Sequence, residues 1–315
     1  MTTLHSLTTL LFLSSLLACG PLFQSGDVDP GAGGGTDATT VDAGPDPDLR
    51  PDLIAARPYL DQTPGDYDSA TAWPLVLSLH GYGSNGADTA SRVGLTTRVD
   101  EHGYLLAYPD GTIINGERGW NASCCGALYS DVDDVAYLRA VIADMSTRYH
   151  VDPKRVFVIG ISNGGFMAHL LGCQAADRIA AMVTHAGTMF LGEPPSCQPT
   201  AAVALRHSHG TADETVAYDG GAWTYGMIRI SYIGAVAAVD IWRNRNGCST
   251  TSTGGSTDVD LSIAGAETTT TSYAEGCRDG QSVELYRLQG SSHIPMFNPA
   301  YIDSAIEFLY AHPRR

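Results

Sequence analysis

The sequence predicts an α/β fold with a mostly parallel central sheet and helices on both faces. Two observations carry this prediction. Apolar runs of strand length alternate with segments of helical spacing between residues 73 and 309, and several runs end in glycine-rich or polar corners. This alternation is typical of parallel strands joined by helices. The 315 residues, 43% hydrophobic and 17% charged, suit one large domain of this class.

The expected elements follow in chain order. We expect strands over 73–80, 103–108, 156–161, 179–184, 201–207 and 283–288, because each is a short run rich in apolar residues. The clearest helix is expected over 133–150, where apolar residues recur at a spacing of three and four. Further helices are expected from the glycine corner after Ser162, over 230–245, and from Asn298-Pro299 to residue 309, where Asn is a good cap and Pro a good first residue.

The N-terminus predicts export. The apolar core from Leu10 to Ala18 is too short to span a bilayer and is typical of a signal peptide, which we assign to residues 1–19. It ends in Leu16-Leu17-Ala18-Cys19, which resembles a bacterial lipobox with Cys19 as the lipidated residue. Cleavage without lipid is the alternative, so the protein is expected to be secreted or anchored by lipid at the cell envelope.

Residues 20–52 predict a disordered acidic linker. They consist mainly of Gly, Asp, Pro and Thr, and they bury too little to offset the entropy of ordering. The folded domain is therefore expected over residues 53–315. A net charge of -16 disfavours nucleic acid as a partner, because a phosphate backbone requires a basic surface. We expect a monomer that meets a membrane only through Cys19.

The strand over 156–161 runs into a candidate nucleophile. Gly160-Ile161-Ser162-Asn163-Gly164 is a G-x-S-x-G turn between a strand and a helix, and such a turn exposes the serine hydroxyl. The free N–H groups at the helix start face an anion that forms beside Ser162. The alternative is a glycine-rich turn between two core elements.

A nucleophilic serine needs a base and a carboxylate, which in an α/β-hydrolase sheet follow it in the order Ser, Asp or Glu, His. Asp213 follows one later strand and His293 follows the last, so they are the candidate acid and base. Glu214 is the second candidate for the acid and Asp219 a weaker third. The chain order disfavours three other histidines as the base: His207, His209 and His312.

The loop His80-Gly81-Tyr82-Gly83 follows the first strong strand. In hydrolases of this kind, a backbone N–H of this loop joins the N–H after the nucleophile to hold the oxyanion. We therefore predict the main-chain N–H groups of Tyr82 and Asn163 as the two donors.

Six motifs in this order resemble a family of secreted esterases: Leu79-His-Gly-Tyr-Gly83, Trp120-Asn-Ala-Ser-Cys-Cys-Gly126, Val132-Asp-Asp-Val135, Val151-Asp-Pro-Lys-Arg-Val156, Gly160-Ile-Ser-Asn-Gly-Gly165 and His209-Gly-Thr-Ala-Asp213. The family is that of polyhydroxybutyrate depolymerases and of feruloyl or acetylxylan esterases, and the resemblance runs from about residue 57 to 309. It implies an α/β-hydrolase fold and an acyl-serine intermediate, without metal or organic cofactor.

Aromatic residues predict the substrate side of the site. Trp120, Trp223 and Tyr225 are expected near the C-terminal edge of the sheet, where such folds bind ligands, although aromatic residues are also ordinary core residues. Together with export and a tether, they favour an ester of a polymer, either a polyhydroxyalkanoate or an acyl-decorated plant polysaccharide. Two rival classes are a non-catalytic polymer-binding lipoprotein and a serine peptidase of the same fold.

Seven cysteines fit an exported protein. Local spacing favours two disulfides, Cys173–Cys197 and Cys248–Cys277. The adjacent Cys124 and Cys125 form either a vicinal disulfide or free thiols. No Cys or His spacing suggests a structural zinc site.

Overall fold

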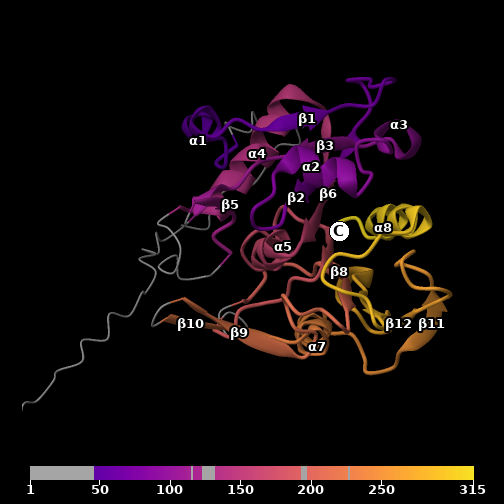
Figure 1. Ribbon diagram of the computed structural model, residues 1–315. Helices are drawn as coiled ribbons and strands as arrows, with labels where there is room; N and C mark the ends of the chain where they lie inside the picture. Colours follow the sequence, from indigo (N-terminus) through magenta and orange to yellow (C-terminus); the bar gives the residue numbers. More distant parts are fainter. Residues whose placement is uncertain (1–45, 115, 123–131, 193–196, 226–227) are drawn as a thin grey trace, which may run out of the picture. The chain divides into compact units, whose positions relative to one another are not determined.

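The computed structural model describes residues 46–114, 116–122, 132–192, 197–225 and 228–315 (Figure 1). The predicted signal peptide, Cys19, Cys124 and Cys125 lie outside these residues, as does the predicted linker up to residue 45. The described part contains a nine-stranded sheet in the order β1-β3-β2-β6-β7-β8-β13-β12-β11. The six strands from β3 to β13 in this order run parallel, while β1, β12 and β11 pair antiparallel at the edges. The predicted α/β class is confirmed.

The strands of this sheet are β1 (Leu60–Gln62), β2 (Trp73–Leu79), β3 (Leu105–Tyr108), β6 (Val151–Ile161), β7 (Ala181–His185), β8 (Ala204–Gly210), β11 (Thr253–Thr257), β12 (Thr268–Tyr273) and β13 (Val283–Leu288). Two hairpins lie apart from it: β4 (Thr112–Ile114) with β5 (Glu117–Gly119), and β9 (Gly220–Tyr225) with β10 (Ile228–Ile233). All six predicted strands are present, with shifts of a few residues at their ends.

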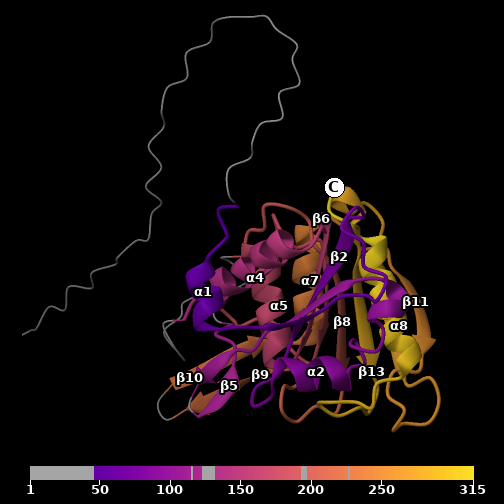
Figure 2. The same ribbon diagram turned by 90° about the horizontal axis from the view of Figure 1, so that it is seen from above.

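The helices are α1 (Pro51–Ala56), α2 (Gly86–Arg92), α3 (Val99–His102), α4 (Asp134–Arg148), α5 (Asn163–Gln174), α7 (Ala235–Arg245), α8 (Pro299–Ala311) and the 3₁₀ turn η1 (Arg278–Gly280). Helices α4, α5 and α7 pack on one face of the sheet and α2, α3 and α8 on the other (Figure 2). Alternate residues of the central strands point to opposite faces, and both faces are covered, so the buried parts of β2, β6 and β7 are mainly apolar. The buried polar residues in these strands are Ser78, Thr184 and His185.

The helix predicted over 230–245 is wrong at its start. Residues 228–233 form β10, and the helix α7 begins only at Ala235. In β10, Ile230 and Tyr232 are buried and alternate with partly exposed residues, and they pair across the hairpin with Trp223 and Gly221. Cross-strand packing of β-branched and aromatic side chains stabilises this strand, and Gly234 separates it from α7.

The last residues of the predicted linker, 46–52, are described in the structure. Residues 46–52 include a turn and the first residues of α1. Arg178 pairs with Asp46 at 2.5 Å and with Asp48 at 2.8 Å, and Arg139 also pairs with Asp48. Asp46 and Asp48 contributed to the prediction of an acidic linker, but in the structure their ion pairs with Arg139 and Arg178 hold this segment against the domain.

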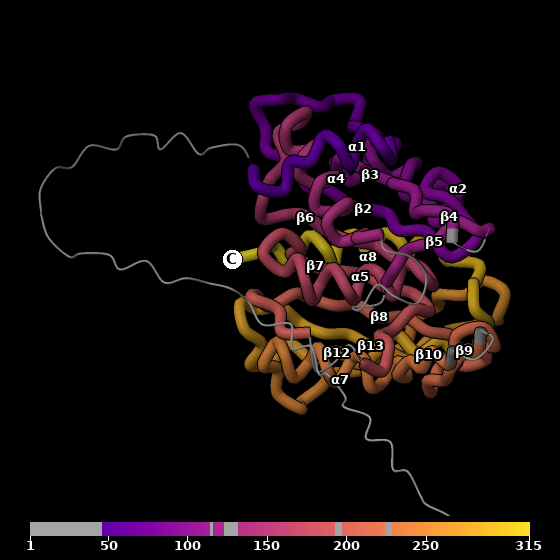
Figure 3. The backbone as a smooth tube through the Cα atoms, turned by 90° about the vertical axis from the view of Figure 1, so that its left-hand side faces the viewer, coloured from indigo at the N-terminus to yellow at the C-terminus, as the bar shows by residue number. Residues whose placement is uncertain are grey.

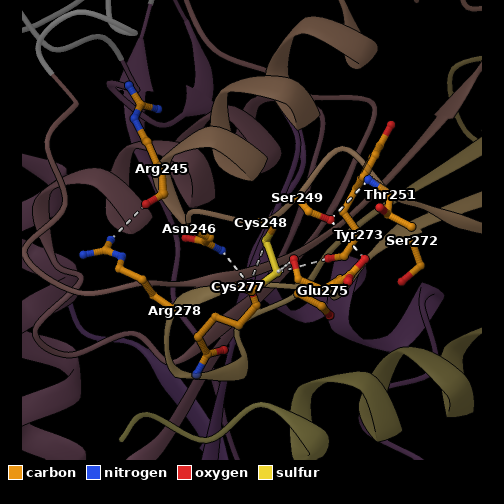
Figure 4. The surroundings of a disulfide bond; sticks show 12 residues. Arg245, Asn246, Cys248, Ser249, Thr251, Ser272, Tyr273, Glu275, Cys277 and Arg278 are labelled. Atoms are coloured by element: carbon orange, nitrogen blue, oxygen red, sulfur yellow. Dashed lines mark hydrogen bonds between the residues drawn. A yellow bond between two sulfur atoms is a disulfide. The ribbon is translucent and has the colours of Figure 1, made fainter.

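Both predicted disulfides are present, Cys173–Cys197 and Cys248–Cys277. The second joins the turn after α7 to the loop after β12 (Figure 4). Beside it, Arg278 donates a hydrogen bond of 3.0 Å to the carbonyl oxygen of Arg245. The tube view shows α7 close to β12 and β13 (Figure 3), and the disulfide thus ties this helix to the antiparallel edge of the sheet.

Candidate active site

Ser162 lies at the turn between β6 and α5, at the C-terminal edge of the sheet. Its backbone is strained, with φ 54° and ψ −119°, in a region that residues other than glycine rarely adopt. The flanking glycines allow this turn: a Cβ atom on Gly160 would collide with the backbone of Gly164, and one on Gly164 with the carbonyl of Leu79. The Ser162 N–H donates to the carbonyl oxygen of His185 at 2.8 Å, which fixes the turn against β7.

The predicted triad residues come together at this edge. His293 Nε2 lies 2.9 Å from Ser162 Oγ, and His293 Nδ1 lies 2.7 Å from Asp213 Oδ2. Because an ionised carboxylate can only accept, Nδ1 carries the proton and Nε2 is left to accept the serine proton. The three groups come from the loops after β6, β8 and β13. Strands β8 and β13 are neighbours in the sheet, and β7 alone separates β6 from β8.

The carboxylate of Asp213 is buried and fully engaged. The N–H groups of Thr215 and Val216 both donate to its Oδ1 at 2.8 Å. Burial raises the pKa of Asp213, but hydrogen bonds from His209, His293 and Val216 outweigh burial and hold the pKa well below its usual range. The two other carboxylates considered, Glu214 and Asp219, are exposed to solvent.

The imidazoles of the three histidines that chain order disfavoured have partners other than Ser162. His207 and His209 are buried in β8. His312 bonds to Ser282 Oγ at 2.8 Å and to the Phe308 carbonyl oxygen at 2.7 Å. His293 is the histidine whose imidazole lies within hydrogen-bonding distance of Ser162 Oγ.

The two predicted oxyanion donors flank Ser162. Asn163 is the first residue of α5, and its side chain is fixed by two hydrogen bonds with the backbone of Trp120, at 2.6 and 3.0 Å. Gly81 lies against the nucleophile, since a Cβ atom there would be 3.4 Å from the Cβ of Ser162. Tyr82, the next residue, is half exposed and borders both cavities beside Ser162. The assignment of their N–H groups to an oxyanion remains a prediction.

Ser162 separates two cavities of different character. The first, of about 150 Å³, is mainly apolar and is lined by Tyr82, Trp120, Ala122, Ser162, Asn163, Phe166, Phe190, Thr215, Val216 and Trp223. The second is an open groove of about 710 Å³ whose walls include His293, Ser84, Asp88, Thr89, Arg92, Ile294, Pro295 and Met296. We call them the aromatic pocket and the polar groove.

Two of the three predicted substrate residues line the aromatic pocket. Trp120 is 1% exposed, and its Nε1 donates to the His80 carbonyl oxygen at 3.0 Å, so it forms a fixed wall. Trp223 on β9 donates to the Thr215 carbonyl oxygen at 3.0 Å. Tyr225 ends β9, and its side chain lies outside the described part of the chain.

Two further pocket residues, Phe166 and Phe190, were not predicted from the sequence, and their rings stack at 4.7 Å between centroids. Phe166 follows the nucleophile by four residues on α5, and its helical spacing from Ser162 was a usable signal. Phe190 has no such signal, since it reaches the site through a bridge with Tyr232 of β10.

Within the described residues, no group of three or more His, Cys, Asp or Glu side chains is arranged to hold a metal ion. A search of the same residues for a helix that is both long and apolar enough to cross a membrane also found none.

Comparison with known proteins identifies relatives. Residues 60–244 match the family model described as Esterase PHB depolymerase. Feruloyl esterase B of Piromyces equi is 27% identical over 241 residues, which cover 75% of this chain and 42% of that protein. The putative esterase NocK of Nocardia uniformis subsp. tsuyamanensis is 34% identical over 164 residues, which cover 51% of this chain and 46% of NocK. The chain thus spans less than half the length of these two relatives.

Among solved structures, the acetyl xylan esterase from Aspergillus awamori superposes with a TM-score of 0.54 at 15% sequence identity. The match covers 79% of this chain and 92% of that one. At this identity the likeness shows the fold alone, and that fold is the α/β-hydrolase fold.

Proposed function

Because the chain belongs to the PHB depolymerase esterase family, we propose that it is an exported serine esterase that cleaves carboxylic esters of a polymer through an acyl-serine intermediate. One observation carries the mechanism: His293 bridges Ser162 Oγ at 2.9 Å and Asp213 Oδ2 at 2.7 Å. Serine, base and acid are therefore already in hydrogen-bonding distance without substrate, as general-base activation of a hydroxyl requires.

The reaction follows from these contacts. Ser162 Oγ attacks the ester carbonyl carbon while its proton passes to His293 Nε2, and Asp213 stabilises the imidazolium that forms. The N–H groups of Asn163 and Tyr82 are proposed to hold the resulting oxyanion. When the bond to the alcohol oxygen breaks, His293 returns the proton to that oxygen. Water then attacks the acyl-serine with His293 as the base, which releases the acid and restores Ser162.

The position of His293 supports a proposal for which side of the substrate each cavity binds. The group that protonates the leaving alcohol must face it, so the alcohol lies on the His293 side of the nucleophile. His293 lines the polar groove and not the aromatic pocket. We therefore propose that the alcohol side of the substrate occupies the polar groove and the acyl group occupies the aromatic pocket.

The aromatic pocket favours a flat acyl group. Its volume of about 150 Å³ matches cavities that hold one benzene ring, and Trp120, Phe166, Phe190 and Trp223 supply its aromatic walls. Stacked or edge-on contacts with a second ring stabilise such a complex by about 0.5–1.5 kcal/mol per pair beyond burial. A polysaccharide that carries an aromatic acyl group is therefore the favoured substrate. Polyhydroxyalkanoate and acetylated xylan are the two alternative substrates that the experiment below also includes.

The groove is suited to a bulky polar alcohol. It is several times larger than the pocket, and Ser84, Asp88, Thr89 and Arg92 offer donors and acceptors along one wall. Ile294, Pro295 and Met296 form the other wall, which suits the apolar face of a sugar ring. The two disulfides are compatible with the export predicted from residues 1–19.

The test compares the wild-type protein with Ser162→Ala on methyl ferulate, p-nitrophenyl acetate, feruloylated arabinoxylan, acetylated xylan, polyhydroxybutyrate film and a peptide library. We expect turnover of the esters with the highest kcat/KM on the feruloyl substrates, and none with the variant. Polymer binding without ester turnover would support the non-catalytic lipoprotein instead. Cleavage of peptides but not of esters would support the peptidase. Turnover of short esters alone would support the esterase activity and contradict the polymeric substrate.

A further inference from the structure

Three buried histidines outside the proposed triad belong to one line of hydrogen bonds beneath the site. His169 lies on α5, and His207 and His209 lie on β8. All three are fully buried. His207 and His209 are two residues apart in a strand, so both side chains point to the face that α5 and α7 cover. A buried polar group is costly unless each of its donors and acceptors has a partner, and the contacts of all three can be followed.

The line begins on α7 and crosses to the sheet. Trp242 Nε1 lies 2.9 Å from His169 Nδ1. The other nitrogen of His169, Nε2, lies 3.5 Å from Thr184 Oγ1 on β7. That hydroxyl lies 2.8 Å from Nδ1 of His207, its neighbour across the β7–β8 pair.

The line ends at the turn that carries the acid. His207 Nε2 lies 3.3 Å from His209 Nδ1. His209 Nε2 lies 2.7 Å from the carbonyl oxygen of Val216 and 3.3 Å from Asp213 Oδ2. Val216 in turn donates its N–H to Asp213 Oδ1 at 2.8 Å. His209 thus contacts both the carboxylate and the segment that holds it.

The two ends of the line fix its direction. An indole N–H can only donate, and a carbonyl or carboxylate oxygen can only accept. Each imidazole between them must therefore accept at Nδ1 and donate from Nε2, and Thr184 must donate to His207. A protonated His169 would set its Nδ1–H against the indole N–H of Trp242. A protonated His207 or His209 would make Thr184 Oγ1 accept from His207 Nδ1 in place of donating, and would leave the buried hydroxyl proton of Thr184 without the acceptor that it has in the neutral line. Burial agrees, because it lowers the pKa of His169 to about 3 and that of His207 well below its ordinary value.

We propose that His209 is a positioning residue for Asp213, and that the line from Trp242 through His169, Thr184 and His207 keeps His209 neutral with its proton on Nε2. This inference rests on the proposed function. A neutral donor orients the carboxylate without neutralising its charge. A cationic His209 would compete with the His293 imidazolium for that charge during the reaction.

Other titratable and charged groups around the pair are compatible with this role. They are His293, His185 on β7, His207, Tyr218 and Arg287. The ring centroid of Tyr218 lies 5.7 Å from that of His209, and Arg287 Cζ lies 5.7 Å from the Tyr218 ring centroid. Burial lowers the pKa of His185 to about 3 and raises the pKa of Tyr218, so both are neutral at neutral pH. His185 Nε2 also donates to the His293 carbonyl oxygen at 3.0 Å.

The kinetic test uses two substitutions of one residue. His209→Met fills a similar volume without a donor, and we expect kcat to fall about ten- to a hundredfold with KM unchanged, because the acid and base lose their alignment. His209→Gln keeps an N–H within reach of Val216 and Asp213, and should restore kcat to within about threefold of wild type. His312→Met is the matched control, since it removes an imidazole that also has two hydrogen bonds but lies outside the line. It should lower stability and leave kcat unchanged.

The second measurement uses the wild-type protein. Nitrogen-15 NMR of the full chain labelled at histidine distinguishes the two neutral forms of each ring. His169, His207 and His209 should all carry the proton on Nε2 at neutral pH, and His169 and His207 should not titrate between pH 5 and 9. An Nδ1–H form at any of the three at neutral pH would overturn the inference, as would a His209→Gln variant as slow as His209→Met. A wild-type protein that hydrolyses no ester would instead refute the proposed function, and the NMR result would still decide the proton positions.

Discussion

Replacing Asp213 by Asn tests the triad with almost no change in shape. Four N–H groups face the carboxylate: those of Thr215 and Val216 at Oδ1, and those of His293 and His209 at Oδ2. An amide has one acceptor oxygen, so it cannot serve both pairs. If the oxygen stays with the backbone pair, the amide NH₂ faces His293 Nδ1, and the imidazole must accept there and carry its proton on Nε2. It then has no lone pair for the proton of Ser162.

The expected loss follows from that change of proton position. In a comparable Ser-His-Asp triad, the Asp→Asn substitution lowers kcat about ten-thousandfold, which corresponds to roughly 5 kcal/mol in the activation free energy. In the opposite orientation the amide oxygen would face His293, and Nε2 would keep its lone pair. The amide NH₂ would then face the N–H groups of Thr215 and Val216, which would cost about 1–3 kcal/mol of stability for each N–H group left without an acceptor. We therefore expect the Asn variant to fold and to lose at least a thousandfold in kcat, by a p-nitrophenyl ester assay.

Glu214→Gln is the matched control for Asp213→Asn. It removes one negative charge from the adjacent residue, whose side chain is exposed. This variant should keep kcat within about twofold, since surface changes away from the site have small effects. If Asp213→Asn loses less than tenfold while Glu214→Gln is inactive, Glu214 is the acid and the assignment of Asp213 is wrong.

Three further predictions address the pH dependence, the turn and the disulfides. Since hydrogen bonds hold the pKa of Asp213 well below its usual range, the carboxylate stays ionised at pH 4, and the acidic limb of log kcat/KM should have slope one; a slope of two would show that a second group titrates. Gly164→Ala should lower the melting temperature and abolish activity, because the added Cβ meets the backbone of Leu79; a variant with wild-type stability would contradict the tight turn. Replacing Cys173 and Cys197 by Ala opens a loop closed over a sequence separation of 24, and should cost about 3 kcal/mol by chemical denaturation, whereas an unchanged midpoint would show that this disulfide does not stabilise the fold.

The sequence predicted the parallel part of the sheet because burial on both faces leaves an unbroken apolar run. The runs around Leu77, Val158 and Val183 all became central strands. The same regularity brought Asp213 and His293 to Ser162, since neighbouring parallel strands deliver their following loops to one edge. Local pattern and chain order were enough for these residues.

The antiparallel strands at the sheet edge gave no comparable signal. Strand β11 has the sequence TGGST and is mostly exposed, so it has neither apolar alternation nor a buried face to mark it. Strand β12 is mainly threonine and is stabilised by pairing with β13. Strands of this kind are defined by their partners, and a single sequence does not contain the partner's register.

The aromatic pocket, where we propose that the acyl group binds, depends on the kind of element that local pattern predicts least well. One of its walls is Trp223 on the β9–β10 hairpin. The ring centroid of Trp223 lies 4.4 Å from that of Tyr232 and 5.7 Å from that of Phe166. The helix predicted over 230–245 covered part of this hairpin, where β10 runs over Ile228–Ile233. Ser162, Asp213 and His293 follow strands of the main sheet, whereas Trp223 lies on a hairpin outside it. Substitutions in this hairpin can therefore change which acyl group fits without moving Ser162 or His293, and this explains why motifs alone identify the reaction more readily than the substrate.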